Sequence, residues 1–363
     1  MKILIMGFGK LKFMPYMNFY LDNLNREEHD IHLLCWNRDL KPDITSGLEG
    51  ITVHEFRCYQ EDDVPKSQKV ESFAKYRKFA LQLLKKEKID FIYVVHTLTG
   101  IVVWDYIRRH YKNRFAFDYR DVTLENNTGF RAMVADMIRQ SRFTFVSSDA
   151  FRIFFPETEN KKVFLCHNID MKALEHRNDN AILRKSDKIR IGFWGFIRDY
   201  RINEKIIEQL GNDLRFELHY YGREQQIGLD LKKYAIEKGF TNVFFHGEYS
   251  PEDKYDFIKD IDLIHNIYDD EGARLAIGNK YYDGIICGVP QVCMRASYMG
   301  RLCVHNGVGF ECNPYTEGFA DELYNKYRNV SKETINENTS KALTKILEDN
   351  ERSIHLINSV RVK

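Results

Sequence analysis

The stretch NKYYDGIICGVP, from Asn279 to Pro290, decides how the rest of this chain is interpreted. Lys280 and Asp283 stand three residues apart, so on a helix they share one face close to its first turn. An apolar run follows, and the closing Gly-Val-Pro stops the helix just before the strand-like residues 291–294. The pattern predicts a short helix that leads directly into a buried strand.

This helix start suits one end of a nucleotide. The free N–H groups and the dipole of a helix N-terminus favour anions, and Gly278 and Asn279 open this one. Lys280 adds a positive charge for a diphosphate, and Asp283 adds a carboxylate that accepts hydrogen bonds from adjacent ribose hydroxyls. The alternative is an ordinary buried helix with a solvated Lys and Asp, and spacing alone does not decide between the two.

The composition indicates a globular protein of two domains. A length of 363 residues exceeds one ordinary domain, and 44% hydrophobic with 29% charged residues excludes a disordered chain. The net charge of +1 provides no overall field for nucleic acid, so no nucleic-acid partner is expected. Residues 1–6 read as a first strand and not as a signal peptide, and no apolar run approaches the roughly 18 residues of a membrane span. We therefore expect a cytoplasmic protein.

The seven cysteines are odd in number and scattered, and none forms a C-x-x-C pair. Zinc binding and a disulfide framework are both disfavoured by this pattern, and free buried thiols are expected instead. No metal and no cofactor is predicted. The sequence also lacks a G-x-S-x-G elbow and a Walker loop, which argues against serine hydrolase and ATPase chemistry.

Strand-like and helix-like segments alternate along the chain, which predicts parallel sheets covered on both faces. Strands are expected at 2–7, 31–35, 90–95, 115–118, 143–146, 162–165, 189–194, 216–220, 243–245, 263–265 and 291–294. Helices are expected at 15–26, 68–88, 99–111, 130–140, 227–238 and 252–259, with another from about 203. The predicted domains are 1–172 and 189–330, with a linker at 173–188 and a C-terminal helix within 331–363 that packs back on the first domain. Ligands of such sheets bind at the carboxyl ends of the strands.

Two glycines follow the first predicted strand, in the segment Gly7-Phe8-Gly9-Lys10. Such a loop suits a phosphate or a sugar, and Gly9 is the candidate contact. The third glycine of a dinucleotide fingerprint is missing, because Lys12 stands three residues after Gly9. NAD is therefore a poor fit, and a tight turn that requires glycine is the competing interpretation.

Polar side chains end two further strands of the first half. His96 follows its most apolar strand, where a histidine can bind a sugar hydroxyl or act as a base. Asp121 and Glu125 follow the strand at 115–118, and either carboxylate could serve as general base for an acceptor hydroxyl. A structural histidine and a turn with a self-paired Arg and Asp are the competing interpretations.

A glycine turn also follows the first strand of the second half, at Gly195, with Arg198, Arg201 and Lys205 after it. Cations one helical turn apart suit a diphosphate, since arginine offers a forked contact and lysine a point charge. A solvated basic helix start is the alternative, although basic residues there oppose the helix dipole.

Taken in chain order, these segments resemble GT-B-fold glycosyltransferases of the family 4 type. The stretch from Asn279 to Pro290 is similar to the family pattern K-L-x-E-Y-x-x-x-G-x-P, with Asp283 where Glu is usual. Residues 167–170, HNID, resemble the family's N-G-V-D, and residues 89–96 resemble its hydrophobic strand that ends in histidine. The similarity covers almost the whole chain and implies two Rossmann-like domains that face each other across a cleft.

The resemblance implies a glycosyltransferase that needs no metal and uses a UDP- or GDP-sugar as substrate. Arg198 and Lys280 would neutralise the diphosphate, Asp283 would bind the ribose, and residues 246–249 and 264–266 would flank the base. His96 and Gly9 would face the sugar, and Asp121 would be the base if the configuration inverts. The complete set of donor-binding candidates is Gly9, Gly195, Arg198, Lys205, His246, Tyr249, Asn279, Lys280 and Asp283.

The implied acceptor is a glycan on a lipid carrier, in the synthesis of a bacterial surface polysaccharide at the inner face of the plasma membrane. Basic segments at 66–88 and 108–114 could touch anionic lipid, although a solvated helix face explains each as well. One departure from the family pattern concerns its paired glutamates, because Leu275 stands eight residues before Asp283, where the first acid belongs. This missing acid leaves a non-catalytic partner subunit as one alternative, and a nucleotide-sugar epimerase built on the same fold is the other.

Overall fold

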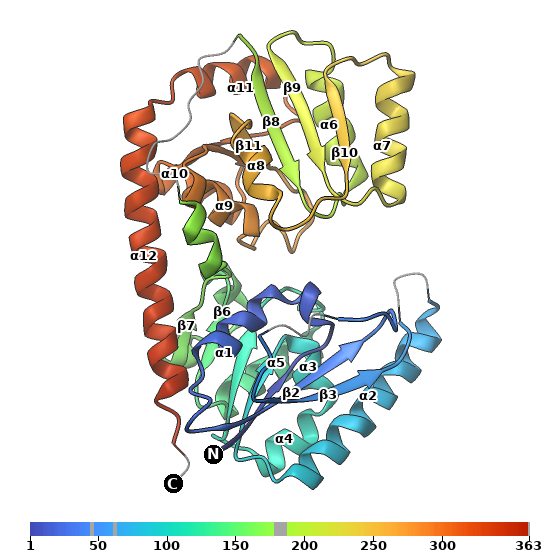
Figure 1. The fold of residues 1–363 in the computed structure, drawn as a ribbon, viewed down its shortest axis with the longest axis vertical. Coiled ribbons are helices and arrows are strands. Elements are labelled where there is room, and N and C mark those ends of the chain that lie inside the picture. The colour runs from blue at the N-terminus through green and yellow to red at the C-terminus, as the bar shows by residue number, and fades with distance from the viewer. Residues whose placement is uncertain (44–46, 61–63, 178–186, 362–363) are drawn as a thin grey trace. The chain divides into compact units, whose positions relative to one another are not determined.

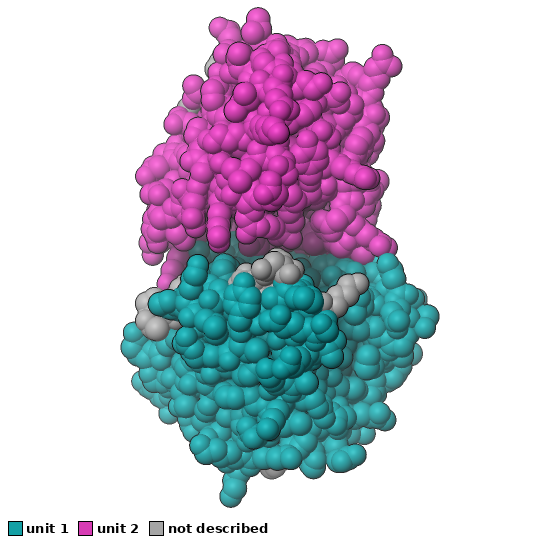
Figure 2. Space-filling model, turned by 90° about the vertical axis from the view of Figure 1, so that its right-hand side faces the viewer, with its two compact units in different colours: residues 1–170, 348–363 teal, residues 171–347 magenta. Residues whose placement is uncertain are grey.

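The computed structural model describes residues 1–43, 47–60, 64–177 and 187–361. The chain divides into two compact units, coloured separately in Figure 2. Unit 1 contains residues 1–170 and 348–363, and unit 2 contains residues 171–347. Most of the linker expected at 173–188 lies outside the described residues, which leave out 178–186. Its first residues belong to η5 (Met171–His176), a 3-10 helix of unit 2.

Unit 1 is built on a seven-stranded sheet of order β3-β2-β1-β4-β5-β6-β7, in which every neighbouring pair is parallel. Its strands are β1 (Lys2–Met6), β2 (Asp30–Asn37), β3 (Ile51–Arg57), β4 (Phe91–Val95), β5 (Phe115–Tyr119), β6 (Thr144–Val146) and β7 (Val163–Leu165). Its helices are α1 (Asn18–Asn23), α2 (Lys66–Glu87), α3 (Thr97–Val102), α4 (Trp104–His110) and α5 (Thr128–Gln140).

Unit 2 repeats this arrangement with a six-stranded parallel sheet of order β10-β9-β8-β11-β12-β13 (Figure 1). Its strands are β8 (Ile189–Trp194), β9 (Phe216–Tyr221), β10 (Val243–Gly247), β11 (Leu263–Asn266), β12 (Gln291–Met294) and β13 (Gly309–Cys312). Its helices are α6 (Tyr200–Leu210), α7 (Gln226–Glu237), α8 (Lys254–Ile258), α9 (Asn279–Cys287), α10 (Tyr298–Asn306) and α11 (Phe319–Arg328). The prediction of two Rossmann-like parallel-sheet halves is therefore confirmed.

The strand order of each sheet reverses beside its first strand, between β1 and β4 and between β8 and β11. Loops that leave these two strands run to opposite faces of the sheet, so they separate and leave room for a ligand at the carboxyl edge. Gly9 and His96 follow β1 and β4, and Gly195 follows β8. The fold thus places these candidates at the two positions where an open α/β sheet binds ligands.

Several elements differ from the sequence prediction. The edge strand β3 was missed, because its residues are only half-buried and one face carries polar side chains. The segments α10, β13 and α11 were missed as well, because their short apolar runs are separated by glycines. The helix expected at 15–26 is shorter, since Pro15 opens a 3-10 turn (η2, Pro15–Met17) before α1 begins. The helix expected at 99–111 is broken at Val103 into α3 and α4.

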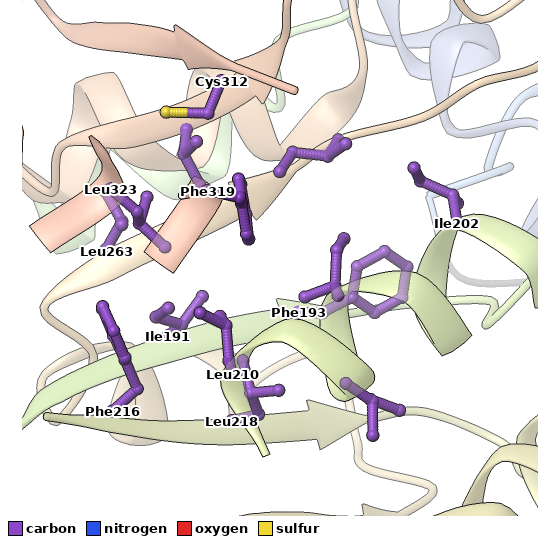
Figure 3. Close-up of a cluster of buried hydrophobic side chains, with 14 of the residues drawn as sticks. Ile191, Phe193, Ile202, Leu210, Phe216, Leu218, Leu263, Cys312, Phe319 and Leu323 are labelled. Carbon is purple, nitrogen blue, oxygen red and sulfur yellow. The ribbon is translucent and has the colours of Figure 1, made fainter. Parts of the chain in front are cut away.

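The core of unit 2 lies between its sheet and the helices α6, α7 and α11. Alternate residues of each strand, such as Ile191 and Phe193 of β8, point into this layer because side chains alternate across a strand. Figure 3 shows them packed against Ile202 and Leu210 of α6 and Phe319 of α11. The next residue along β8, Trp194, points to the opposite face, where it contacts Phe257 of α8.

The last helix, α12 (Lys332–Asn358), begins in unit 2 and ends in unit 1. Ile357 is buried in the core of unit 1, and its carbonyl accepts a hydrogen bond of 3.0 Å from the hydroxyl of Tyr93. Asn350 of the same helix accepts from the backbone N–H of His167 at 2.7 Å. The C-terminal residues are therefore part of the structure of unit 1.

A buried ion pair follows the carboxyl end of β5. The guanidinium of Arg120 contacts both carboxylate oxygens of Asp118 at 2.7 Å, and the hydroxyl of Tyr20 donates to the same carboxylate at 2.6 Å. Asp118 is 1% and Arg120 4% exposed, so each charge depends on the other for solvation.

Replacing Asp118 with Ala should destabilise unit 1 strongly, because it leaves the Arg120 guanidinium buried without its counter-charge. Breaking a buried pair in this way costs about 3–5 kcal/mol, which corresponds to a fall in Tm on the order of 10 °C in calorimetry. Glu71→Ala is the matched control, since it removes the exposed pair between Glu71 and Lys75 on α2. Equal Tm values for Asp118→Ala and Glu71→Ala would contradict this account of the pair.

Candidate functional site

The helix predicted from the stretch at Asn279 is α9, and its ends are as the sequence indicated. Gly278 precedes it in an extended conformation, and Gly288 ends it in the left-handed region with φ of 68°. The N–H of Val289 closes this end by donating to the carbonyl of Gly284 at 2.9 Å. Lys280 and Asp283 lie on the same helix face, and both are buried.

Lys280 is 8% exposed as a residue, and its ammonium lies among aromatic rings. Its Nζ is 4.1 Å from the ring centre of Phe193 and 5.1 Å from that of Tyr268, and it donates to the carbonyl of Trp194 at 3.1 Å. Burial lowers the pKa of Lys280 to about 7; the carboxylate of Asp283 opposes this shift and the charge of Arg198 adds to it. A lysine in this state gains a full charge when an anion arrives.

The carboxylate of Asp283 holds two donors of its own unit. One oxygen accepts from the indole N–H of Trp194 at 2.8 Å, and the other accepts from Nζ of Lys254 at 2.8 Å. A carboxylate offers about four acceptor positions, so this arrangement orients Asp283 and leaves capacity for further donors such as hydroxyl groups. Trp194 and Lys254 were not predicted as part of the site, because neither shows a spacing relative to Asp283 in the sequence.

The loop after β8 carries Arg198 beside this helix. The loop begins at Gly195, with φ of 103°, and approaches the loop after β9 so closely that a Cβ on Gly222 would lie 2.0 Å from the carbonyl oxygen of Gly195. Only glycine fits at position 222 for this reason. The charge of Arg198 reaches both Lys280 and Tyr268, as the pKa values of those two groups show. Lys280 thus donates to the carbonyl directly before Gly195, and Arg198 of the same loop is close enough for its charge to add to the effect of burial on Lys280.

Stacked rings continue the same edge toward β10. The ring of Tyr221 lies between His246, at 4.2 Å and 9°, and Phe257, at 3.8 Å and 5°. Tyr249 meets Phe257 edge-on at 5.2 Å, and the charge of Asp283 acts on Tyr249. Two of the predicted base-flanking residues, His246 and Tyr249, therefore belong to one aromatic cluster that reaches Asp283.

Two other predicted donor contacts have different surroundings. Lys205 lies in the middle of α6, where its Nζ pairs with Glu208 at 2.7 Å and its charge acts on Tyr234 of α7. The structure does not bring Lys205 together with Lys280. Asn279 is the exposed first residue of α9 and stands directly before Lys280.

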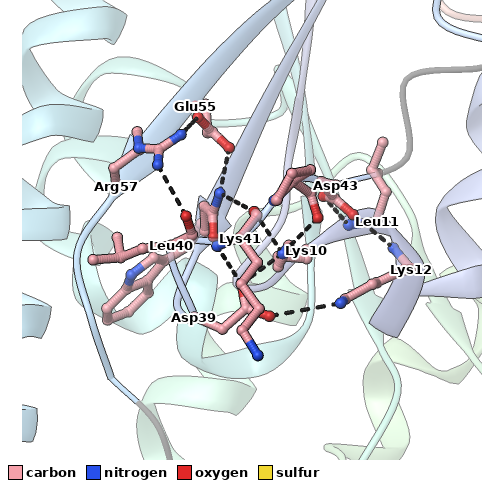
Figure 4. A network of polar contacts seen from close by, with 12 residues as sticks. Lys10, Leu11, Lys12, Asp39, Leu40, Lys41, Asp43, Glu55 and Arg57 are labelled. Carbon is pink, nitrogen blue, oxygen red and sulfur yellow. Dashed lines mark hydrogen bonds and ion pairs between the residues drawn. The ribbon is translucent and has the colours of Figure 1, made fainter.

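In unit 1 the loop after β1 is held by its own lysine (Figure 4). Lys10 is 1% exposed, and its Nζ donates to Asp39 at 2.5 Å and to the carbonyls of Lys41 and Pro42 at 2.8 and 2.9 Å. An ammonium has three N–H donors, so Lys10 is fully occupied by the loop after β2. The carbonyl of Gly9 accepts from the N–H of Trp36 at 3.0 Å, which fixes the turn. The contact of Gly9 with a sugar stays a prediction.

His96 ends β4 in a conformation that is rare for a residue with a side chain. Its φ is 76°, its N–H donates to the carbonyl of Asp118 at 2.9 Å, and its Nδ1 accepts from the N–H of Leu98 at 3.3 Å. Burial lowers the pKa of His96, and Asp121 is close enough for its charge to oppose this shift and to raise the pKa of Tyr16. The structure therefore brings His96, Asp121 and Tyr16 together at this edge. Strained residues of this kind are concentrated at functional sites.

Comparisons with known proteins concern the fold and the first unit of the chain. Residues 2–141 match the family model described as Glycosyl transferase 4-like. Sucrose-phosphate synthase from Thermosynechococcus elongatus has a similar structure, with 11% identity, 98% of both chains covered and a TM-score of 0.73. HepE from Anabaena, solved in complex with UDP-glucose, has 17% identity over 99% of this chain and 100% of its own, with a TM-score of 0.67. No curated protein sequence matches the chain significantly.

A protein named as a UDP-N-acetylglucosamine 2-epimerase from Listeria monocytogenes is also similar, with 13% identity over 93% of this chain and 90% of its own, and a TM-score of 0.58. The chain therefore has the GT-B fold of glycosyltransferases. Residues 2–141 match the glycosyl transferase 4-like family model. The resemblance to GT-B-fold glycosyltransferases of the family 4 type is therefore confirmed.

Within residues 1–43, 47–60, 64–177 and 187–361, no three or more His, Cys, Asp or Glu side chains are grouped so as to hold a metal ion. In the same part of the chain, no helix combines the length and the apolar character that crossing a bilayer requires.

The stability of the protein should depend on pH through Lys280. Because burial lowers its folded pKa from 10.5 to about 7, the unfolded chain binds one more proton than the folded chain between these pH values. Stability therefore rises with pH across this window and is lowest below pH 7. In Lys280→Met this contribution is absent, so the variant should gain most over the native chain near pH 6 and lose the advantage toward pH 10.

Urea denaturation at pH 6, 8 and 10 measures the difference between the two proteins at each pH. Lys205→Met is the control. Lys205 is half-buried beside Glu208, so replacing it does not remove the cost of burying a charged ammonium. A native-minus-variant difference that stays constant from pH 6 to pH 10 would show that Lys280 is charged throughout.

Proposed function

We propose that the protein is a glycosyltransferase that moves a sugar from a UDP- or GDP-sugar to a glycan acceptor on a lipid carrier. The observation that carries this proposal is a pair of cations, Lys280 on the first turn of α9 and Arg198 in the loop after β8. Lys280 is buried on aromatic faces with its pKa lowered to about 7, and the charge of Arg198 lowers it further. Like charges that act on each other are unfavourable in the free protein, and a diphosphate that contacts both removes that cost.

The surrounding groups match the rest of a nucleoside diphosphate. Asp283 is oriented by Trp194 and Lys254 and has acceptor positions left for the ribose hydroxyls. The aromatic cluster that contains His246 and Tyr249 is suited to a flat base. The neighbour HepE was solved with UDP-glucose, which supports a donor of the same class.

Bond cleavage in such a transfer places negative charge on the departing diphosphate. Lys280 and Arg198 are held in place before the reaction, so they stabilise this charge without reorganisation and in place of a metal ion. In unit 1, His96 would face the sugar, and Asp121 would take the proton of the acceptor hydroxyl if the configuration inverts. The neighbouring sucrose-phosphate synthase shares the fold that we assign to this chemistry.

We assign the product to a bacterial surface polysaccharide, made at the cytoplasmic face of the plasma membrane. The helices α2 and α4 support contact with that surface, because the last turn of α2 carries Lys85 and Lys86 and the last turn of α4 carries Arg108 and Arg109. Clustered basic side chains of this kind attract anionic lipid headgroups.

Donor binding should require Lys280 and should take up a proton. At pH 8.5 Lys280 is mainly neutral, and a bound diphosphate raises its pKa, so about one proton enters per site. Calorimetric titration of UDP and GDP in two buffers of different ionisation enthalpy measures this uptake.

Lys280→Met should abolish the proton uptake and weaken binding at least about 100-fold, as expected for a buried contact to a charged group worth about 3 kcal/mol. Lys205→Met is the matched control and should bind as the native chain does. Native affinity in Lys280→Met, together with unchanged proton uptake, would refute the assignment of this site.

The reaction class is tested separately, because a nucleotide-sugar epimerase, the activity in the name of the Listeria neighbour, is a second candidate function. A thermal-shift screen of UDP-, GDP-, dTDP- and CMP-sugars first selects the donor that stabilises the fold. A transferase should then leave the selected sugar nucleotide unepimerised when no acceptor is present, and should release the nucleoside diphosphate once a glycan-lipid acceptor is added. Conversion of the sugar without acceptor would indicate the epimerase, and failure to turn over with any acceptor would indicate a non-catalytic subunit.

A further inference from the structure

A buried histidine at the carboxyl end of β11 has both ring nitrogens in defined contacts. His265 is 2% exposed, and its Nδ1 accepts from the backbone N–H of Ile267 at 3.0 Å. The ring proton therefore belongs to Nε2, which lies 3.2 Å from the side-chain oxygen of Asn203 on α6 and donates to it. Burial and the nearby charge of Lys280 lower the pKa of His265 to about 3, so this tautomer persists at neutral pH.

The amide of Asn203 passes this contact on to the loop after β8. Asn203 is 2% exposed, and its Nδ2 donates to the carbonyls of Arg198, at 3.0 Å, and Asp199, at 2.9 Å. An amide nitrogen has two N–H donors, so both are used, and the oxygen is held by His265. The side chain thus connects β11 to the two carbonyl groups that flank the start of α6.

The loop needs such a connection because its conformation is unfavourable by itself. Asp199 has φ of 66° and ψ of 81°, which is rare for a residue with a Cβ, and its side chain makes no capping hydrogen bond to α6. The charges of Arg198 and Lys280 also repel each other, and this repulsion adds to the larger effect of burial in lowering the pKa of Lys280. Without an opposing restraint, both effects would let the loop relax and carry Arg198 away.

We propose that Asn203 and His265 are positioning residues that hold the loop at Arg198 and Asp199, so that the guanidinium of Arg198 meets the donor diphosphate beside Lys280. This inference rests on the proposed function of the site and adds to it the part of the chain that maintains its geometry. In this role Asn203 acts through the backbone of the loop, and His265 acts through Asn203. Both ring nitrogens of His265 are taken by protein groups, so the role assigned to it differs from the base contact predicted for residues 264–266.

A second buried asparagine of unit 2 provides a matched control. Asn242 is 8% exposed, and its Nδ2 donates to the carbonyls of Leu210, Asp213 and Phe216 at 2.9, 3.2 and 3.0 Å. It therefore restrains the loop between α6 and β9, at the amino edge of the same sheet. Asn242→Ala should lower the thermal stability as much as Asn203→Ala does, or more, without changing nucleotide binding.

The test is a double-mutant cycle between Asn203→Ala and Arg198→Ala, read by the affinity for UDP, or for GDP if the native chain prefers it. Asn203→Ala should weaken the binding of the nucleoside diphosphate about tenfold, since it removes two buried hydrogen bonds from the loop. It should leave the affinity for the nucleoside alone, uridine or guanosine, unchanged. In the Arg198→Ala background, the same change should have less than about a twofold further effect, because the contact that it positions is already gone.

Several results would overturn the inference. One is that the effects of Asn203→Ala and Arg198→Ala on affinity multiply in the double variant. Another is that Asn203→Ala weakens the binding of nucleoside and nucleoside diphosphate equally. A third is that Asn242→Ala weakens the binding of the diphosphate as much as Asn203→Ala does. If Arg198→Ala itself leaves UDP and GDP binding intact, the proposed donor site is wrong, and the inference falls with it by a distinguishable route.

His265 provides a second approach if Asn203→Ala does not fold. His265→Gln retains a side-chain N–H donor toward Asn203 and should keep the diphosphate affinity within about twofold, whereas His265→Leu removes the donor and should lose about tenfold. Equal affinities in these two variants would exclude the role assigned to His265.

Discussion

The environment of the Lys280 ammonium is the constraint on which the second half of this protein depends. Its charge is buried on the faces of Phe193 and Tyr268, with one hydrogen bond to a backbone carbonyl. Asp283 of the same helix supplies the opposing charge, and that carboxylate is in turn held by Trp194 and Lys254. A set of charges that is balanced only in part explains why α9, the loop after β8 and α8 must be placed together.

A comparison with Lys10 shows how the same residue type serves two purposes in one chain. Both lysines are buried and both follow glycines at the carboxyl edge of a parallel sheet. Lys10 has an acceptor for each of its N–H groups, including the carboxylate of Asp39, so it stabilises a loop. Lys280 has one protein acceptor and aromatic faces, so its charge is available to an anion. The difference lies in the acceptors that surround each ammonium.

Much of the fold and part of the site can be predicted from the sequence. Unbroken apolar strands that alternate with helices fix two parallel sheets, and the glycines around α9 fix its ends, because local patterns determine both. Lys280 and Asp283 are found by their spacing on that helix. Trp194, Lys254, Asn203 and His265 could not be predicted, since their contacts join residues 29 to 89 positions apart. Lys205 was selected for its distance from Arg198 along a helix, and its orientation toward α7 depends on packing that sequence spacing does not contain.

The division of the chain into units has a consequence for how the protein is made. Unit 1 includes the first 170 residues and the last 16, and Ile357 and Val360 belong to its core. A ribosome produces a chain from its N-terminus, so the strands of unit 1 emerge before unit 2, and the residues that complete the core of unit 1 emerge after it. Unit 2 is contiguous and has all its residues before unit 1 does. The core of unit 1 therefore stays incomplete while the whole of unit 2 is synthesised, and its exposed apolar surface must remain soluble during that time.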